Sequence, residues 1–202
     1  KGYVSTLRRD DVQWDRGVMV SSLQVIEEEA DRLTSLIEDL LDATRLQAGA
    51  MQLKRSDISL HQLAKHLAER LQVQTDQHQI IVDIPENFPV VLADEVRIGQ
   101  VLSNLISNAI KYAPDGEIRI SGQVQPNEVI ICVQDEGPGI AASDIPHIFD
   151  RFYRAPENSR KTKGAGLGLY LARAIVEAHH GRMWADPKTN IGARICFCLP
   201  RD

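Results

Sequence analysis

Hydrophobic positions between residues 18 and 47 recur at alternating intervals of three and four, a pattern that predicts one long helix of a bundle. The apolar seam consists of Leu23, Ile26, Ala30, Leu33, Ile37, Leu40 and Thr44. Because Leu36 and Leu41 widen this seam, we expect a four-helix bundle, which a single hairpin completes only by forming a homodimer. Gly49 is expected to end the helix, and residues 1–9 are expected to be the tail of an earlier helix.

After residue 50 the pattern changes to a mixture of short strands and amphipathic helices. Strands are expected at residues 51–58, 78–84, 117–124 and 128–134, and in two closing segments that end at Leu199. Helices are expected at residues 60–74, from the N-cap Asp94 to Tyr112, and at residues 167–180. Because the two element types do not alternate strictly, we predict an α+β sandwich, with one mixed or antiparallel sheet under a helical layer. The predicted domains are residues 1–50 and 51–202.

Composition and charge narrow the classes of function. The 202 residues are 43% hydrophobic and 25% charged, which is typical of a globular protein. A net charge of -5 without a long run of Lys or Arg argues against a nucleic-acid partner. Cys132, Cys196 and Cys198 lie in apolar runs and match no metal-binding spacing, so we expect buried, reduced thiols in the cytoplasm. No stretch is apolar and long enough to cross a bilayer, so a membrane anchor is expected only in segments outside this sequence.

Two asparagines lie one turn apart in the helix that ends at Tyr112. Asn104 and Asn108 share one surface of this helix with Lys111. Asparagine is unfavourable inside helices, so a chemical role is the better explanation, and a solvated polar face is the alternative. An amide oxygen is a suitable ligand for Mg2+, and a lysine supplies a charge for phosphate. This surface is therefore a candidate site for a metal and a phosphate group.

A second candidate segment, residues 135–140, directly follows a predicted strand and reads Asp-Glu-Gly-Pro-Gly-Ile. Gly137 and Gly139 would let the backbone approach a planar ligand closely. Asp135 can accept a hydrogen bond from an exocyclic amine such as that of adenine. Taken alone, the same segment is also compatible with an ordinary glycine turn capped by an aspartate.

Glycines also precede the last predicted helix. Residues 164–169 read Gly-Ala-Gly-Leu-Gly-Leu, and a glycine-rich break at a helix N-terminus offers free amide groups to phosphate. The segment matches neither a Walker A loop nor a Rossmann motif. The charged residues 154–163 before it are expected to form a lid over a triphosphate, with a flexible surface loop as the alternative. Phe149 and Phe152, at the start of the lid, are expected to anchor it in the core.

Taken in order, these segments resemble the nucleotide-binding boxes of two-component sensor histidine kinases. Residues 100–112 resemble the N box, residues 135–139 the G1 box, residues 149–154 the F box and residues 164–169 the G2 box. Residues 26–49 also resemble the second helix of the dimerisation and histidine-phosphotransfer hairpin. The resemblance covers the whole chain and implies a Bergerat ATP-binding fold preceded by a helical-hairpin dimerisation segment.

The resemblance also implies roles for individual residues. Asn108 would bind Mg2+ with the support of Asn104, and Lys111 and Arg154 would contact phosphate. Asp135 would bind adenine. The wider set of expected ATP-binding residues is Asn108, Lys111, Tyr112, Asp135, Gly137, Gly139, Ile140, Phe152, Arg154, Lys163, Gly164, Gly166, Leu167, Gly168 and Leu169.

The sequence departs from the family pattern at two points. Ala165 stands where the family often has threonine, and we expect the lost hydroxyl to weaken ATP affinity modestly. The His-Glu-x-x-Thr-Pro type of segment is missing, so the phosphoryl acceptor is expected upstream of this sequence. The six histidines are each expected to be structural or solvated. For His179 and His180, at a helix C-terminus, the helix dipole favours the imidazolium form.

The function implied by the resemblance is that of an ATP-dependent protein-histidine kinase. It would transfer the γ-phosphoryl group to a histidine, for relay to an aspartate in the receiver domain of a response regulator. One alternative is an ATP-sensing or dimerising module that transfers no phosphate. Another is a gyrase- or MutL-type ATPase, or an anti-sigma serine kinase, of the same fold. Those families carry a glutamate where Asn104 stands, and asparagine cannot act as a general base.

Overall fold

The computed structural model describes residues 15–201, apart from residues 48–51, 156–164, 188 and 190. The chain divides after Thr44 into two compact units, and each is described by itself. Most of helix α2 (Arg16–Gln47) belongs to the first unit, and its 32 residues confirm the predicted long helix. None of the described helices has the length and apolarity required to cross a membrane.

The apolar seam of α2 is open to solvent in this chain. Leu33 is 60% exposed and Ile37 is 58% exposed, and Leu23 and Leu40 are also exposed. Exposed leucine and isoleucine in one row of a helix are typical of a surface that a partner helix covers. Dimerisation through this seam stays a prediction, and the expectations for Gly49 and residues 1–9 lie outside the described residues.

The second unit is built on a mixed sheet with the strand order β2-β4-β5-β7-β6. The pairing of β2 with β4 is parallel and the other three pairings are antiparallel. The strands of this sheet are β2 (His78–Asp83), β4 (Gly116–Val124), β5 (Glu128–Gln134), β6 (Arg182–Ala185) and β7 (Arg194–Pro200). A separate antiparallel pair joins β1 (Ser56–Ile58) to β3 (Val91–Ala93).

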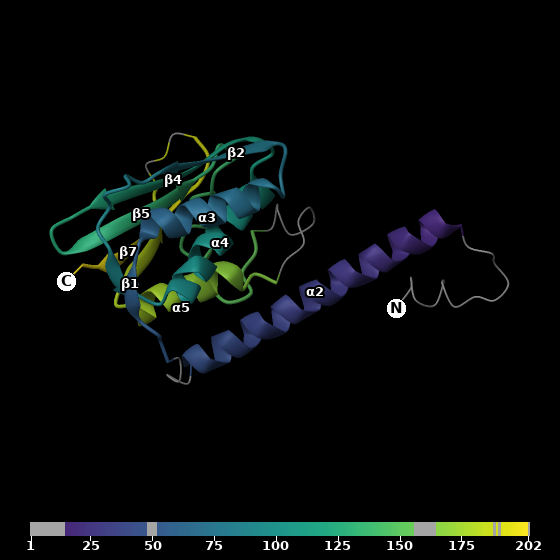
Figure 1. The fold of residues 1–202 in the computed structure, drawn as a ribbon, viewed down its shortest axis with the longest axis horizontal. Helices are drawn as coiled ribbons and strands as arrows, with labels where there is room; N and C mark the ends of the chain where they lie inside the picture. Colours follow the sequence, from purple (N-terminus) through teal and green to yellow (C-terminus); the bar gives the residue numbers. More distant parts are fainter. Residues whose placement is uncertain (1–14, 48–51, 156–164, 188, 190, 202) are drawn as a thin grey trace. The chain divides into compact units, whose positions relative to one another are not determined.

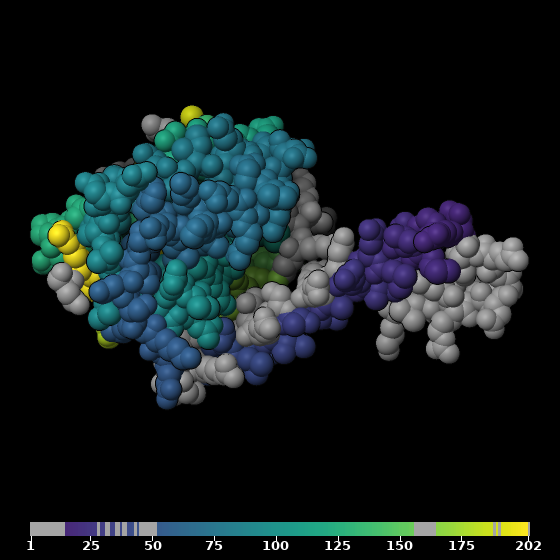
Figure 2. All heavy atoms as spheres, viewed as in Figure 1, coloured from purple at the N-terminus to yellow at the C-terminus, as the bar shows by residue number. Residues whose placement is uncertain are grey.

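Three helices cover one face of the five-stranded sheet: α3 (Leu60–Gln72), α4 (Glu95–Tyr112) and α5 (Gly168–Ala178) (Figure 1). Figure 2 shows that the atoms of α3 and its neighbouring segments, drawn in blue, cover this side of the unit. A mixed sheet under one helical layer is the architecture that the sequence predicted, so the α+β prediction is confirmed.

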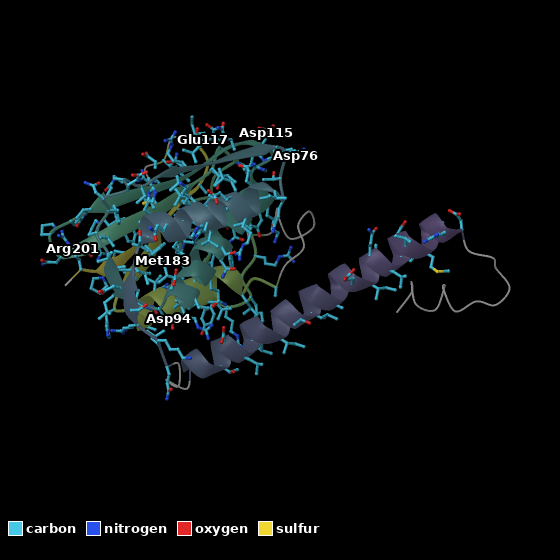
Figure 3. All side chains as sticks on the ribbon, viewed as in Figure 1. Asp76, Asp94, Asp115, Glu117, Met183 and Arg201 are labelled. Atoms are coloured by element: carbon cyan, nitrogen blue, oxygen red, sulfur yellow. A yellow bond between two sulfur atoms is a disulfide. The ribbon has the colours of Figure 1, made fainter. Side chains whose placement is uncertain are left out.

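The helix starts follow from their capping residues. The Ser59 side chain accepts a hydrogen bond from the backbone N of Gln62, and Asp94 Oδ1 accepts one from the backbone N of Arg97 at 3.1 Å. Asp94 was predicted as the N-cap of α4, and this prediction is confirmed. Figure 3 places Asp94 and Asp115, which flank α4 in the sequence, at opposite ends of the unit, so α4 runs along its length.

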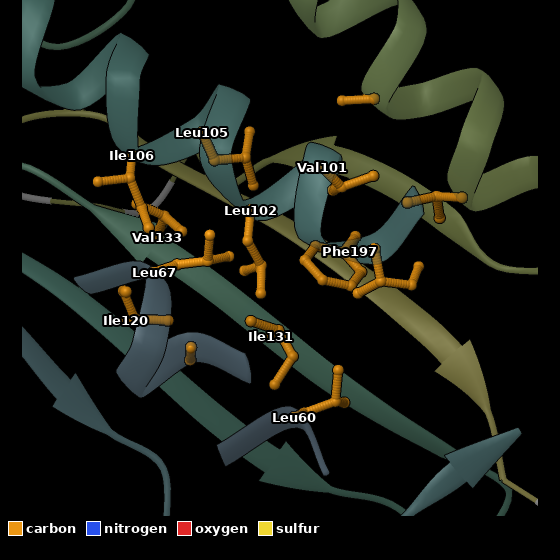
Figure 4. Packing of buried hydrophobic residues seen from close by; sticks show 14 of the residues in the cluster. Leu60, Leu67, Val101, Leu102, Leu105, Ile106, Ile120, Ile131, Val133 and Phe197 are labelled. Carbon is orange, nitrogen blue, oxygen red and sulfur yellow. The ribbon is translucent and has the colours of Figure 1, made fainter. Parts of the chain in front are cut away.

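The core lies between α4 and the sheet (Figure 4). Along α4 the buried stripe consists of Ile98, Val101, Leu102, Leu105, Ile106 and Ala109. From the sheet, Ile120, Ile131 and Phe197 point toward this stripe, because alternate residues of a strand face the same side. Leu60 and Leu67 of α3 complete the packing. With this stripe buried, the rotation of α4 about its own axis is fixed.

Some predicted boundaries are wrong. Strand β1 does not include residues 52–55. Its partner strand β3 has only three residues and cannot pair with a longer strand. The backbone N of Lys54 donates instead to Asp94 Oδ2 at 2.8 Å. Strand β3 itself was not predicted, since three residues carry too little pattern to reveal a strand. Helices α3 and α5 each end two residues before the predicted end, at Gln72 and Ala178, and β2 ends one residue early, at Asp83.

The expectation of three reduced cysteines is also wrong. All three cysteines are buried as expected, but Cys132 and Cys196 form a disulfide and only Cys198 is free. Cys132 of β5 and Cys196 of β7 lie directly opposite each other in the sheet. The linear sequence does not tell which strands pair or in which register, and for this reason the contact could not be predicted.

His180 provides a test of the backbone at the end of α5. It is exposed and adopts φ 63°, a left-handed conformation that costs an ordinary residue about 1 kcal/mol or more. His180→Gly should therefore raise the free energy of unfolding by about 1 kcal/mol in urea denaturation. The same substitution at the exposed His66, inside α3, should lower it by about 1 kcal/mol. A loss of stability in both variants would contradict this assignment.

Candidate functional site

A cavity of about 310 Å³ opens between α4, the ends of β5 and β7 and the segment that follows β5. The described residues of its lining are Leu105, Asn108, Ala109, Tyr112, Val133, Asp135, Pro138, Gly139, Ile140, Ala141, Asp144, Ile148, Tyr153, Arg154, Ala155, Leu169, Ala193 and Ile195. Most of them are apolar, and the few polar groups come from separate elements. Such a lining is typical of a ligand site that binds a flat apolar group and orients it with a few hydrogen bonds.

The predicted polar surface of α4 is divided between the cavity and its border. Asn108 and Tyr112 line the cavity. Asn104 lies one turn earlier and donates from Nδ2 to the backbone O of Gly168 at 3.3 Å, so it ties α4 to the first residue of α5. Lys111 is not among the lining residues, and its Nζ lies 4.9 Å from the ring centroid of Tyr112.

Asp135 joins two segments at the end of β5. Its Oδ1 accepts hydrogen bonds from the backbone N of Gly137 at 2.9 Å and from the backbone N of Ala193 at 3.0 Å. The described residues make no hydrogen bond to Oδ2, so this oxygen is available for a ligand in the cavity. Gly139 lines the cavity with φ 78°, which glycine adopts without strain, whereas Gly137 is not among the lining residues.

The glycine segment before α5 packs against Phe152 and Tyr153. The backbone N of Phe152 donates to the O of Gly166 at 3.0 Å, and Gly166 has φ 72°. A Cβ at Gly166 would lie only 2.6 Å from the O of Tyr153, so the close approach requires glycine. Leu167 is buried and Leu169 lines the cavity, while the predicted Lys163 and Gly164 lie outside the described residues.

The two phenylalanines that precede the predicted lid differ in burial. Phe149 is 8% exposed and belongs to the core, as expected. Phe152 is 56% exposed and does not line the cavity, so the expectation that it anchors the lid in the core is wrong. Its φ of 64° is a left-handed conformation that a bulky residue rarely adopts.

Several lining residues were missed by the sequence prediction. Tyr153 donates from its hydroxyl to Asp144 Oδ1 at 2.9 Å, and this hydrogen bond raises the pKa of Tyr153. Tyr153 lies within the box that resembles the F box, which was a usable signal. Ala193 and Ile195 enter the cavity from β7 and its preceding turn, and no local pattern marks them because the sheet topology brings them there.

Comparison with known proteins places the chain in a family. A family model described as "Histidine kinase-, DNA gyrase B-, and HSP90-like ATPase" matches residues 93–202, which include α4, the cavity and β7. The chain belongs to this ATPase family. Sensor histidine kinase WalK of Bacillus subtilis (strain 168) is 37% identical over 183 residues, which are 88% of this chain and 30% of that protein. The chain therefore spans about a third of the length of this curated relative.

Solved structures agree with the family assignment. The crystal structure of full-length ShkA in complex with AMPPNP superposes with a TM-score of 0.80 at 26% identity, over 95% of this chain and 40% of that one. The histidine kinase ThkA, crystallised in complex with the response regulator protein TrrA, superposes with a TM-score of 0.75 over 98% of this chain and 56% of that one. At 22% identity the second likeness shows the fold alone. The predicted resemblance to a sensor histidine kinase and its Bergerat fold is confirmed.

In this ATPase domain, α4 begins at a buried cluster of hydrogen bonds. The backbone N of Asp94 donates to His179 Nε2 at 3.0 Å, and His179 Nδ1 lies 2.8 Å from the O of Ile175. The ring therefore carries its proton on Nδ1, since Nε2 must accept. Because Asp94 also accepts from Lys54, the cluster joins the start of α4, the end of α5 and the chain segment that enters the ATPase domain.

The expectation of an imidazolium at His179 is wrong. The side chain is 3% exposed, and this burial lowers the pKa of His179. The nearby charges of Arg55 and His180 lower it further, while the hydrogen bond to Ile175 and the carboxylate of Asp94 act in the opposite direction. Burial outweighs the helix dipole because it removes the ring from water.

A neutral His179 makes the stability of the ATPase domain depend on pH. In the unfolded chain histidine takes up a proton near pH 6.5, whereas the folded domain resists protonation until lower pH. The contribution of His179 to the free energy of unfolding is thus fully present above about pH 6.5 and is lost as the pH falls toward the lower pKa of the folded state. The free energy of unfolding should fall between pH 7 and pH 5, and His179→Gln should reduce that fall. His66→Gln, at an exposed position, should leave this pH-dependent fall unchanged. An equal effect of the two variants would contradict the assignment of a buried, neutral His179.

Proposed function

We propose that this chain binds Mg-ATP in the cavity beside α4 and transfers the γ-phosphoryl group to a histidine on a helical segment of a sensor kinase. The phosphoryl group would then pass to an aspartate of a response regulator. The observation that carries the proposal is the meeting of Asp135, Asn108 and Arg154 in the lining of one cavity. These residues supply a hydrogen-bond acceptor, a metal ligand and a cationic group.

Asp135 and its apolar neighbours in the lining suit adenine. Asp135 Oδ2 is available to accept from the exocyclic amine, while Oδ1 is held by two backbone N–H groups. Val133 and Ile195 of the sheet and Leu105 of α4 supply apolar surface for a flat ring. The AMPPNP complex of ShkA supports a nucleotide as the ligand of the related cavity here.

Asn108 and Arg154 in the same lining suit the triphosphate and its metal. The amide oxygen of Asn108 is a hard ligand, and Mg2+ takes most of its remaining ligands from water and phosphate oxygens. Among the described residues, no group of three or more His, Cys, Asp or Glu side chains could hold a metal ion without such help. This donor set fits a metal that arrives with ATP. Arg154 supplies a positive charge, and the glycine segment at the start of α5 supplies backbone amides.

Within this proposal the protein contributes position and charge to the reaction. Asn108 orients the metal and phosphates, and Arg154 balances the negative charge of the phosphoryl group in transfer. Asn104 is held by Gly168 and has no basic group, so it cannot activate water or a hydroxyl. That chemistry favours transfer to a histidine, which is itself a nucleophile, over the reaction of a gyrase-type ATPase or a serine kinase.

The proposed partners follow from the same assignment. The exposed seam of α2 supports a homodimer, in which a second copy covers Leu33 and Ile37. The complex of ThkA with TrrA supports a response regulator as the phosphoryl acceptor of the second step. A cytoplasmic location is proposed as well, because response regulators and ATP would meet the domain there.

The metal-binding role of Asn108 can be tested by calorimetry. Asn108→Ala removes the amide oxygen and should weaken Mg-ATP binding by about tenfold or more, because a lost contact to a charged group costs about 1.5–3 kcal/mol. The matched control is Asn127→Ala, at an exposed position in the turn between β4 and β5, which should bind as the parent does. Equal affinity of the parent and Asn108→Ala would exclude this role, and so would binding that is independent of Mg2+.

A further inference from the structure

Disulfide Cys132–Cys196 lies on the face of the sheet that the helices do not cover. It bridges β5 and β7, and the two residues are directly opposite in the register although 64 positions separate them in the sequence. The side chains packed around the bridge are Ile130, Cys198 and Trp184. All three come from strands, so no described helix contributes to this hydrophobic cluster.

The bridge stands directly behind the floor of the nucleotide cavity. Val133 follows Cys132 and Ile195 precedes Cys196, and these two residues are paired with each other and line the cavity. Neighbouring residues of a strand point to opposite faces of the sheet. The sulfur atoms therefore lie on one face, and the side chains of Val133 and Ile195, which form the cavity floor, lie on the other face in the adjacent residue pair. Any change in the spacing of β5 and β7 at the bridge must reach this floor.

The same two strands also hold the aspartate proposed to bind adenine. Beyond the bridge, the backbone N of Asp135 donates to the O of Ala193, and the backbone N of Ala193 donates to Asp135 Oδ1, each at 3.0 Å. Both hydrogen bonds require β5 and β7 to keep a fixed separation at this end. The disulfide is therefore in a position to control the geometry of Asp135.

Reduction would change the space that the two sulfur atoms need. Bonded sulfurs are about 2.05 Å apart, whereas non-bonded heavy atoms keep roughly 3.5–4 Å. Cys132 is 3% exposed and Cys196 is 2% exposed, so the added separation cannot be taken up in open solvent. It has to be absorbed by side-chain rotation under Trp184 or by a wider spacing of the strands.

We propose that Cys132 and Cys196 form a reversible redox site, which reacts with low-molecular-weight thiols and disulfides and tunes the affinity of the cavity for ATP. The proposal rests on the proposed function, since it requires the cavity to bind ATP. In the oxidation, one cysteine thiolate attacks a disulfide RSSR and releases RS⁻ to form a mixed disulfide. The second thiolate displaces the other RS⁻, so two protein thiols and RSSR give the protein disulfide and two RSH.

Cys198 is the natural control for this chemistry. It lies two residues beyond Cys196 on the same strand and is the free cysteine of the chain. Cys198 is 3% exposed, as buried as the two bridged cysteines, so burial does not set it apart from them. It is directly opposite Ile130 in the register and so has no cysteine across from it.

The disulfide form should bind ATP more tightly. With β5 and β7 linked, the cavity floor and Asp135 are ordered before the ligand arrives, and the loss of conformational freedom on binding is smaller. Coupling between two sites is reciprocal at equilibrium, so ATP must stabilise the disulfide against reduction by the same factor by which the disulfide raises ATP affinity.

To test the proposal, the whole chain is equilibrated with either oxidised glutathione or dithiothreitol, and the number of free thiols in each sample is measured by alkylation and mass spectrometry. The affinity of each sample for Mg-ATP is then measured by calorimetry. We expect the reduced chain to bind at least about fivefold more weakly. Cys198→Ser should keep this difference. Cys132→Ser should bind like the reduced chain under both conditions.

A second arm uses reciprocity and needs no variant. The fraction of reduced protein is measured in buffers with graded ratios of reduced to oxidised glutathione, with and without saturating Mg-ATP. Mg-ATP should raise the equilibrium ratio at which half of the disulfide is reduced, by the same factor by which the disulfide raises ATP affinity. Equal ATP affinity of the oxidised and reduced chains, or thiols that stay free under oxidised glutathione, would overturn the redox site and leave the ATP assignment intact. Absence of ATP binding in both states would overturn the proposed function and the redox proposal together.

Discussion

The burial of one stripe of α4 is the constraint on which the ATPase domain depends. This stripe packs onto the sheet and fixes the rotation of the helix, so Asn108 and Tyr112 can only face the cavity. Both ends of the helix are also held by buried histidines. The backbone N of Asp94 donates to His179 at the start, and His78 Nε2 lies 3.3 Å from the O of Ala113 at the end. A site on a helix with this support is positioned by the core and needs little ordering by a ligand.

The cavity also depends on the alignment of β5 with β7. One face of this strand pair packs in the core and forms the cavity floor, and the other face carries the disulfide. At its end, Asp135 and Ala193 exchange hydrogen bonds that set the position of the carboxylate. The proposed nucleotide and redox sites thus lie on the two faces of one strand pair, so a chemical change on one face could alter ATP affinity on the other without touching the ligand.

Sequence pattern was sufficient wherever one element carries its own signal. The periodicity of α2 and α4, the N-cap Asp94, and the ordered glycine segments were enough to predict the fold class and most of the polar groups of the cavity. Sequence pattern was not sufficient where segments distant in the sequence meet in the fold. Ala193, Ile195 and the Cys132–Cys196 bridge depend on the pairing of β5 with β7, and the neutral state of His179 depends on burial against α4. Such features arise from tertiary packing, which overrides local preferences such as the helix dipole.

The central claim is that this domain donates phosphate to histidine. Its most direct test incubates the chain with Mg-ATP labelled at the γ-phosphate, together with a separate helical fragment that carries the phosphorylated histidine of a related sensor kinase. Since Asn104 offers no general base, we expect acid-labile phosphohistidine on the fragment and little free phosphate without it. Rapid release of labelled phosphate in the absence of the fragment would contradict this account, as would a fragment that stays unlabelled although ATP is bound.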